Sequence, residues 1–229
     1  MKGREVPVKP IALVVCILLA THAAADAQDR EYAPFSEYEM SRESEIALAR
    51  SAAPEKISAS ATIKVLTRNG FEIAVEGDNG FLCMVMRSWS AAPDPETTYY
   101  SKLRAPICFD PVAARTVAPA EELRTRLGLE GKPPAAIAQE IAVRYGLGQL
   151  PKMEAAAFAY MWSANQDTGP GFGAWHPHMM IYAPYYENAL LGGNEIGNHS
   201  APFVAGGGTP FSTVIVVVDE TLAIKAREK

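Results

Sequence analysis

Two glycine-containing turns, at residues 68–70 and 78–80, divide residues 61–88 into three runs rich in β-branched and aromatic side chains. Such runs, separated by turns that contain Asn-Gly, are typical of consecutive antiparallel strands. The third run is apolar on both faces, which indicates that other elements cover it on both sides. The sequence therefore predicts a three-stranded meander, and this element constrains the fold more than any other part of the chain.

Register decides the length of the turns, because a slip of one residue moves a whole apolar set to the other face of a strand. A three-residue first turn pairs Ile63 with Val75 and Val65 with Ile73, whereas a two-residue turn mixes polar and apolar partners. The same length for the second turn sets the third strand beside the second. The predicted core face comprises Ile63, Val65, Phe71, Ile73, Val75, Phe81, Cys83 and Val85.

Helical patterns follow Ser41, which suits an N-cap, and recur at residues 120–127 and 134–145. Further strand candidates are residues 158–163, 178–183 and 213–219. We therefore expect an α+β fold: an antiparallel or mixed sheet that includes the meander, packed by two or three helices. Residues 28–40 are predicted to be an extended or disordered arm, and residues 41–229 a single domain.

Residues 1–27 have the pattern of a signal peptide. Basic residues lie near the start, Ile11–Ala20 is an unbroken apolar run, and Ala25-Asp26-Ala27 is a small-x-small cleavage site. The run is about half the length of a membrane span, so we expect cleavage near Ala27, no transmembrane segment afterwards, and a periplasmic or secreted protein. The leader carries three basic and two acidic residues, so its loss changes the net charge from −5 to −6. This acidic balance argues against nucleic acid as a partner.

Cys83 and Cys108 are the cysteines that remain after the leader, which contains Cys16, is removed. An isolated pair in an oxidising compartment is usually a disulfide, with two buried thiols as the alternative. Their spacing does not fit a C-x-x-C redox motif, so we expect a structural role.

Three histidines form the candidate metal site. His176 and His178 are two residues apart in a segment that Pro177 biases toward an extended conformation, so both rings point the same way. His199 lies in a loop that can fold back, and Glu187 or Glu195 can add a carboxylate. Such a set suits a divalent transition metal with an open position. The alternative is that the histidines hydrogen-bond the backbone or each other.

Aromatic residues cluster in the sequence around these histidines. They form either the wall of a ligand site or the core of the last strands. The ligand-binding candidates are Tyr160, Trp162, Trp175 and Tyr182. Neither G-x-S-x-G nor S-x-x-K occurs, so Ser163 has no nucleophile motif around it.

Several segments of the chain resemble a family of uncharacterised exported bacterial proteins. These segments are residues 47–54, 80–83, 87–89, 104–109 and the Trp-His-Pro-His run at 175–178. The resemblance implies an envelope or secreted location and transfers no catalytic residue. We therefore expect a non-catalytic exported domain that binds a small molecule or an envelope protein. The alternative is a metal-dependent, hydrolytic enzyme that uses His176 and His178.

Overall fold

The computed structural model describes residues 31–90, 95–154, 156–169, 176–194 and 198–227. Apart from Glu31, the described residues all belong to one compact unit, Tyr32–Lys229. The predicted signal peptide and residues 28–30 of the predicted arm lie outside the described residues. Within the described ranges, no helix is both long enough and apolar enough to cross a membrane.

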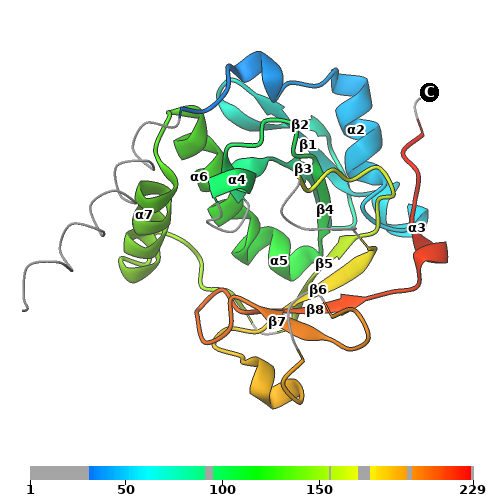
Figure 1. Cartoon of the computed structure of the whole chain (residues 1–229). Coiled ribbons are helices and arrows are strands. Elements are labelled where there is room, and N and C mark those ends of the chain that lie inside the picture. Colours follow the sequence, from blue (N-terminus) through cyan, green and yellow to red (C-terminus); the bar gives the residue numbers. More distant parts are fainter. Residues whose placement is uncertain (1–30, 91–94, 155, 170–175, 195–197, 228–229) are drawn as a thin grey trace, which may run out of the picture. The chain divides into compact units, whose positions relative to one another are not determined.

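Eight strands of the described ranges form one mixed sheet (Figure 1). Strands β1 and β3 are parallel, and every other neighbouring pair in the sheet is antiparallel. The predicted α+β class with a mixed sheet is therefore confirmed. In spatial order the strands are β2 (Gly70–Val75), β1 (Thr62–Thr67), β3 (Leu82–Met86), β4 (Ala105–Phe109), β5 (Ala157–Met161), β6 (His178–Tyr182), β8 (Thr213–Val217) and β7 (Phe203–Ala205).

Helices cover both faces of this sheet (Figure 1). Helix α2 (Arg42–Arg50) packs on β1, β3 and β4, and its predicted N-cap Ser41 accepts a hydrogen bond from the Ser44 amide. Helices α5 (Pro111–Thr116) and α6 (Ala118–Leu129) lie on the opposite face, and α7 (Pro134–Gly146) packs against α6. The shorter helical elements are η1 (Phe35–Glu37), α3 (Glu55–Ser58), η2 (Ser88–Ser90), α4 (Pro95–Thr98), η3 (Asn188–Leu191) and η4 (Glu220–Leu222).

The predicted meander is confirmed in its first hairpin and wrong in its second. Thr67 pairs with Gly70, so the first turn has two residues and the predicted three-residue turn is wrong. A bulge after Ile63 restores the predicted pair of Ile63 with Val75, but Val65 faces Glu72 and not Ile73. Strand β3 does not pair with β2; it runs parallel to β1 on the other side of that strand. The connection passes the start of β1, where the Thr62 amide donates to the Phe81 carbonyl at 2.9 Å.

The position of β3 beside β1, and not beside β2, has a physical reason. Strand β3 is apolar on both faces and is buried over most of its length, so an interior position removes more of its surface from water. Strand β2 carries polar side chains and lies at the edge, where Ile73 is 47% exposed. The predicted placement of Ile73 on the core face is therefore wrong.

Cys83 and Cys108 form the predicted disulfide. Cys83 on β3 lies directly opposite Cys108 on β4. The bond is fully buried beneath α2, in a cluster that includes Ile63 and Val85. It therefore fastens two central strands on the α2 face of the sheet.

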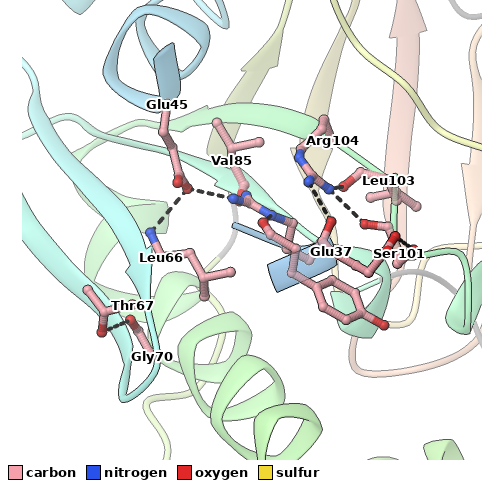
Figure 2. Close-up of polar contacts among 11 residues, drawn as sticks. Glu37, Glu45, Leu66, Thr67, Gly70, Val85, Ser101, Leu103 and Arg104 are labelled. Atoms are coloured by element: carbon pink, nitrogen blue, oxygen red, sulfur yellow. Dashed lines mark hydrogen bonds and ion pairs between the residues drawn. The ribbon is translucent and has the colours of Figure 1, made fainter. Parts of the chain in front are cut away.

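A buried ion pair joins α2 to the end of β3 (Figure 2). Arg87 and Glu45 are 0% and 1% exposed, and Arg87 Nη2 lies 3.0 Å from Glu45 Oε1. The same oxygen accepts from the Leu66 amide at 3.1 Å, while Arg87 donates to the carbonyls of Tyr38 and Val85. Burial raises the pKa of Glu45 and lowers the pKa of Arg87 to about 10, because desolvation penalises both charges.

Residues 32–40 of the predicted arm pack onto the domain. Tyr38 is 1% exposed and stacks on Trp89, with ring centroids 4.3 Å apart. Arg104 Nη2 donates to the Glu37 carbonyl at 3.0 Å (Figure 2). Trp89 in turn lies against Gly128 of α6, where a Cβ atom would come within 2.2 Å of the indole. Tyr38 thus belongs to the core, and Tyr32 and Phe35 pack against the same cluster while half-buried, which differs from the predicted extended or disordered arm.

Candidate functional site

A small cavity lies between the sheet and helices α6 and α7. Its volume is about 130 Å³. An engineered cavity of about 150 Å³ with apolar walls binds benzene, so this one has room for a molecule of about that size. Its apolar walls are formed by Met86, Ile107, Val117, Ala120, Met153, Met180 and Phe211.

Polar side chains from the helical segments and from strands β6 and β8 also line this cavity. On α6, Arg124 Nε lies 3.6 Å from Glu121 Oε1. The second carboxylate oxygen, Glu121 Oε2, is buried and has no hydrogen-bond partner among the described residues. A buried polar atom left unpaired is costly, so a donor that reaches this oxygen stabilises it. The polar lining residues are Ser90, Glu121, Arg124, Tyr145, Tyr182 and Thr213.

Two tyrosines supply hydroxyl groups next to this acid. Burial raises the pKa of Tyr182 well above its usual range, and the negative charges of Glu121 and Asp110 raise it further. Burial and Glu121 raise the pKa of Tyr145 in the same way. Both phenols therefore keep their protons at neutral pH and are available as hydrogen-bond donors.

Aromatic packing shapes the wall near α7. The ring of Phe211 meets that of Tyr145 edge to face, with centroids 5.1 Å apart. The guanidinium of Arg124 lies over the same Phe211 ring, 6.0 Å from its centroid. These contacts hold Arg124 and Tyr145 beside the cavity, because each side chain packs on one aromatic surface.

The predicted aromatic ligand-binding residues that the structure describes lie in two different places. Tyr182 lines the cavity. Tyr160 lies on the α2 face of the sheet, where its ring packs edge to face on Trp162 at 5.5 Å. Trp175 lies outside the described residues. One of the four predicted residues is thus at the cavity, and Glu121 and Arg124 were not predicted.

The structure brings part of the predicted histidine set together. The rings of His176 and His199 have centroids 4.2 Å apart, and His176 Nδ1 lies 2.9 Å from Glu220 Oε1. His178 Nδ1 hydrogen-bonds the His176 carbonyl at 2.9 Å. The carboxylate in this cluster is Glu220, which was not predicted, while Glu195 lies outside the described residues.

Metal content is the first property of this histidine cluster to test. A catalytic zinc ion takes three protein ligands, and no group of three or more potential ligands is arranged to hold an ion in the ranges that the structure describes. We expect protein purified without a histidine tag to carry no stoichiometric transition metal by elemental analysis, and zinc to leave its Tm unchanged. Stoichiometric metal that is lost from a His176→Ala, His199→Ala variant would contradict this.

The stability of the domain is expected to depend on the titration of His178. Burial lowers its pKa, and positive charge on His199 and His176 lowers it further. As the pH falls below the unfolded value of about 6.5, the unfolded chain binds a proton at this position before the folded chain does, so stability falls. Thermal melts between pH 7.5 and 5.5 should show Tm falling with pH, less steeply in His178→Asn. Equal slopes of Tm against pH in the wild type and in His178→Asn would contradict the role given to His178.

Ser163 is fully buried and belongs to a structural hydrogen-bond chain. Its Oγ accepts from the Asn165 amide at 3.2 Å and lies 2.7 Å from Ser51 Oγ, which donates to the Leu48 carbonyl. Each hydroxyl therefore has its partners inside the protein, and Ser163 has no path to a substrate.

The fold and the cavity define an α+β domain with one disulfide in its core and a small amphipathic cavity on the α6 face of its sheet. No family model, curated protein or solved structure matches this chain. The functional argument therefore rests on the residues of the cavity.

Proposed function

We propose that this chain is an exported protein, periplasmic or secreted, whose mature domain binds a small amphipathic molecule in the cavity without catalysing a reaction. The observation that carries the proposal is the buried, unpartnered Glu121 Oε2 beside a wall of methionine and phenylalanine. Ligand sites typically combine such an apolar lining with a few polar groups that fix orientation. The ligand thus gains both burial of apolar surface and a hydrogen bond.

Export is supported by the leader pattern of residues 1–27 and by the cysteines. Both cysteines beyond the leader are paired with each other, and disulfides persist in oxidising compartments. The resemblance of residues 47–54 and 175–178 to exported bacterial proteins supports the same location. Sequencing the N-terminus of protein recovered from the periplasm or the medium of a bacterial host tests this part, with Gln28 as the expected first residue.

Binding is favoured over catalysis by the state of the cavity's polar groups. Tyr145 and Tyr182 have raised pKa values and therefore keep their protons at neutral pH, so neither offers a phenolate as a general base. Glu121 is accompanied by Arg124, which offsets its charge. The alternative, a metal-dependent hydrolytic enzyme using His176 and His178, depends on the outcome of the elemental analysis described above.

Toluene is a suitable first probe, because its size matches the cavity and it lacks polar groups. At tenfold its Kd we expect toluene to stabilise the domain by about 1.4 kcal/mol, which corresponds to a Tm increase of about 3–5 °C. Ala120→Leu should abolish the increase, because Ala120 is 4% exposed and a leucine there fills the cavity. Ala142→Leu, the same change at an exposed position of α7, is the matched control and should still show the Tm increase with toluene.

The cavity-filling variant separates a specific site from nonspecific binding. Saturable toluene binding that persists in a folded Ala120→Leu protein would place the ligand elsewhere and contradict the proposal. The absence of any binding of toluene or phenol to the wild-type protein would contradict it directly.

A further inference from the structure

The polar groups of the cavity specify what kind of head group its ligand carries. Glu121 Oε2 is an acceptor without a donor among the residues described. A carboxylate oxygen cannot donate, so a molecule that pairs with it must bring an O–H or N–H group. An ether, ketone or hydrocarbon leaves this oxygen unpaired.

Tyr182 supplies the complementary group. The side chain comes from β6, is 5% exposed and lines the cavity. Burial raises the pKa of Tyr182 well above its usual range, and the charges of Glu121 and Asp110 raise it further, so its hydroxyl keeps its proton and can donate. Asp110, the other acid that affects Tyr182, already accepts from the amides of Ala113 and Phe158. A residue with an unpaired acceptor and a residue that can donate therefore line the same cavity.

The charge of the site favours a neutral head group. Arg124 Nε lies 3.6 Å from Glu121 Oε1, so the two side chains together carry no net charge. An ammonium ion here would be desolvated next to the guanidinium, and a carboxylate next to Glu121. A hydroxyl group both donates and accepts without bringing a charge.

The walls indicate an aromatic body. Met86, Met153 and Met180 surround the space, and Phe211 closes one side. Thioether sulfur makes favourable contacts with aromatic rings, and methionine adapts its shape to fill the remaining gaps. A six-membered ring with one small substituent matches a cavity of about 130 Å³.

We propose that the ligand is a small neutral phenol, whose hydroxyl donates to Glu121 Oε2 and accepts from the Tyr182 hydroxyl while its ring lies against the methionines. This inference rests on the proposed function. It goes further, because it names the class of ligand and the two residues that select it.

Phenol and toluene form the test pair, since each has seven non-hydrogen atoms and only phenol has the hydroxyl. Phenol is better hydrated than toluene, so the affinities of the two probes are not compared with each other. For each probe, the affinity of the variant is compared with that of the wild type. We expect Glu121→Met to weaken phenol about tenfold or more and to leave toluene unchanged or tighter, because a hydrogen bond to a charged group is worth about 1.5–3 kcal/mol. Tyr182→Phe should weaken phenol about threefold to tenfold and spare toluene.

The matched control is Glu122→Met, the same change at the next residue of α6. Glu122 pairs with Lys64 outside the cavity, so the affinities of both probes should remain at the wild-type values. Calorimetry measures each affinity, and thermal melts confirm that each variant folds. If Glu121→Met does not fold, Tyr182→Phe alone decides the result.

The outcomes distinguish this inference from the proposed function. If toluene binds and Ala120→Leu blocks it, but phenol is affected by neither Glu121→Met nor Tyr182→Phe, the site exists and the phenol inference is overturned. If neither probe binds the wild-type protein, both proposals fail. A loss confined to phenol in either variant supports both.

Discussion

Arg87→Met is expected to lower the free energy of unfolding by about 3–5 kcal/mol, the largest effect of any single substitution considered for this chain. The variant leaves Glu45 1% exposed and without its cation, so a buried charge loses its compensation. It also removes the donors that reach the carbonyls of Tyr38 and Val85. Denaturant unfolding of the wild type and the variant measures the difference.

Two further variants show whether burial of the charge causes this loss. Glu45→Met combined with Arg87→Met should be less destabilised than Arg87→Met alone, because no unpaired buried charge remains. Arg144→Met, which removes an ion pair with Glu140 that is about two-fifths exposed, should cost about 0–1 kcal/mol. An Arg87→Met protein as stable as Arg144→Met would contradict the role assigned to the buried pair.

The Cys83→Ala, Cys108→Ala variant is expected to lose about 3–4 kcal/mol of stability. The disulfide closes a loop with a sequence separation of 25 residues, and opening it restores conformational entropy to the unfolded chain. Both cysteines are fully buried in the α2-face cluster, so truncation to alanine adds a small loss of packing. Denaturant midpoints measure the effect.

Reductant supplies the control for the disulfide. A reducing agent should lower the stability of the wild type toward that of the double variant and should leave the double variant unchanged. Mass spectrometry of exported wild-type protein should show no free thiol. Two free thiols, or a wild type indifferent to reductant, would contradict the pairing.

Local sequence signals predicted much of the fold. The cap at Ser41, the first hairpin and the strand that begins at His178 each depend on neighbours in the chain, and the structure has all three. The position of β3 depends instead on which side of β1 is free. A hairpin and a crossover past the strand end share the same glycine turn, so local pattern could not separate them.

Helix α5 shows a signal that was present but not used. Asp110 followed by Pro111 is a strong helix start, and the Asp110 carboxylate accepts from the Ala113 amide. The candidate site was harder to predict. Glu121 and Arg124 have the i,i+3 spacing of any exposed helical ion pair, and only the packing of α6 on the sheet makes one carboxylate oxygen buried.

Tyr182 is a predicted ligand-binding residue that lines the cavity. It was predicted among ligand-binding aromatics because it lies near the histidines in the sequence, but it points toward the α6 face with Met180. Tyr160 lies on the opposite face of the neighbouring strand. Alternation along a strand assigns residues to two faces, and it does not say which face has a cavity.

Methyl NMR of the protein labelled at its methionines tests the central claim most directly. Met86, Met153 and Met180 line the cavity, whereas Met40 and Met179 lie away from it on the α2 side of the sheet. Titration with phenol is expected to shift the three cavity methyl signals with one saturable curve and to leave Met40 and Met179 unchanged. If the signals of all five of these methionines move together, or if the three cavity signals do not move, the result contradicts a ligand site in this cavity.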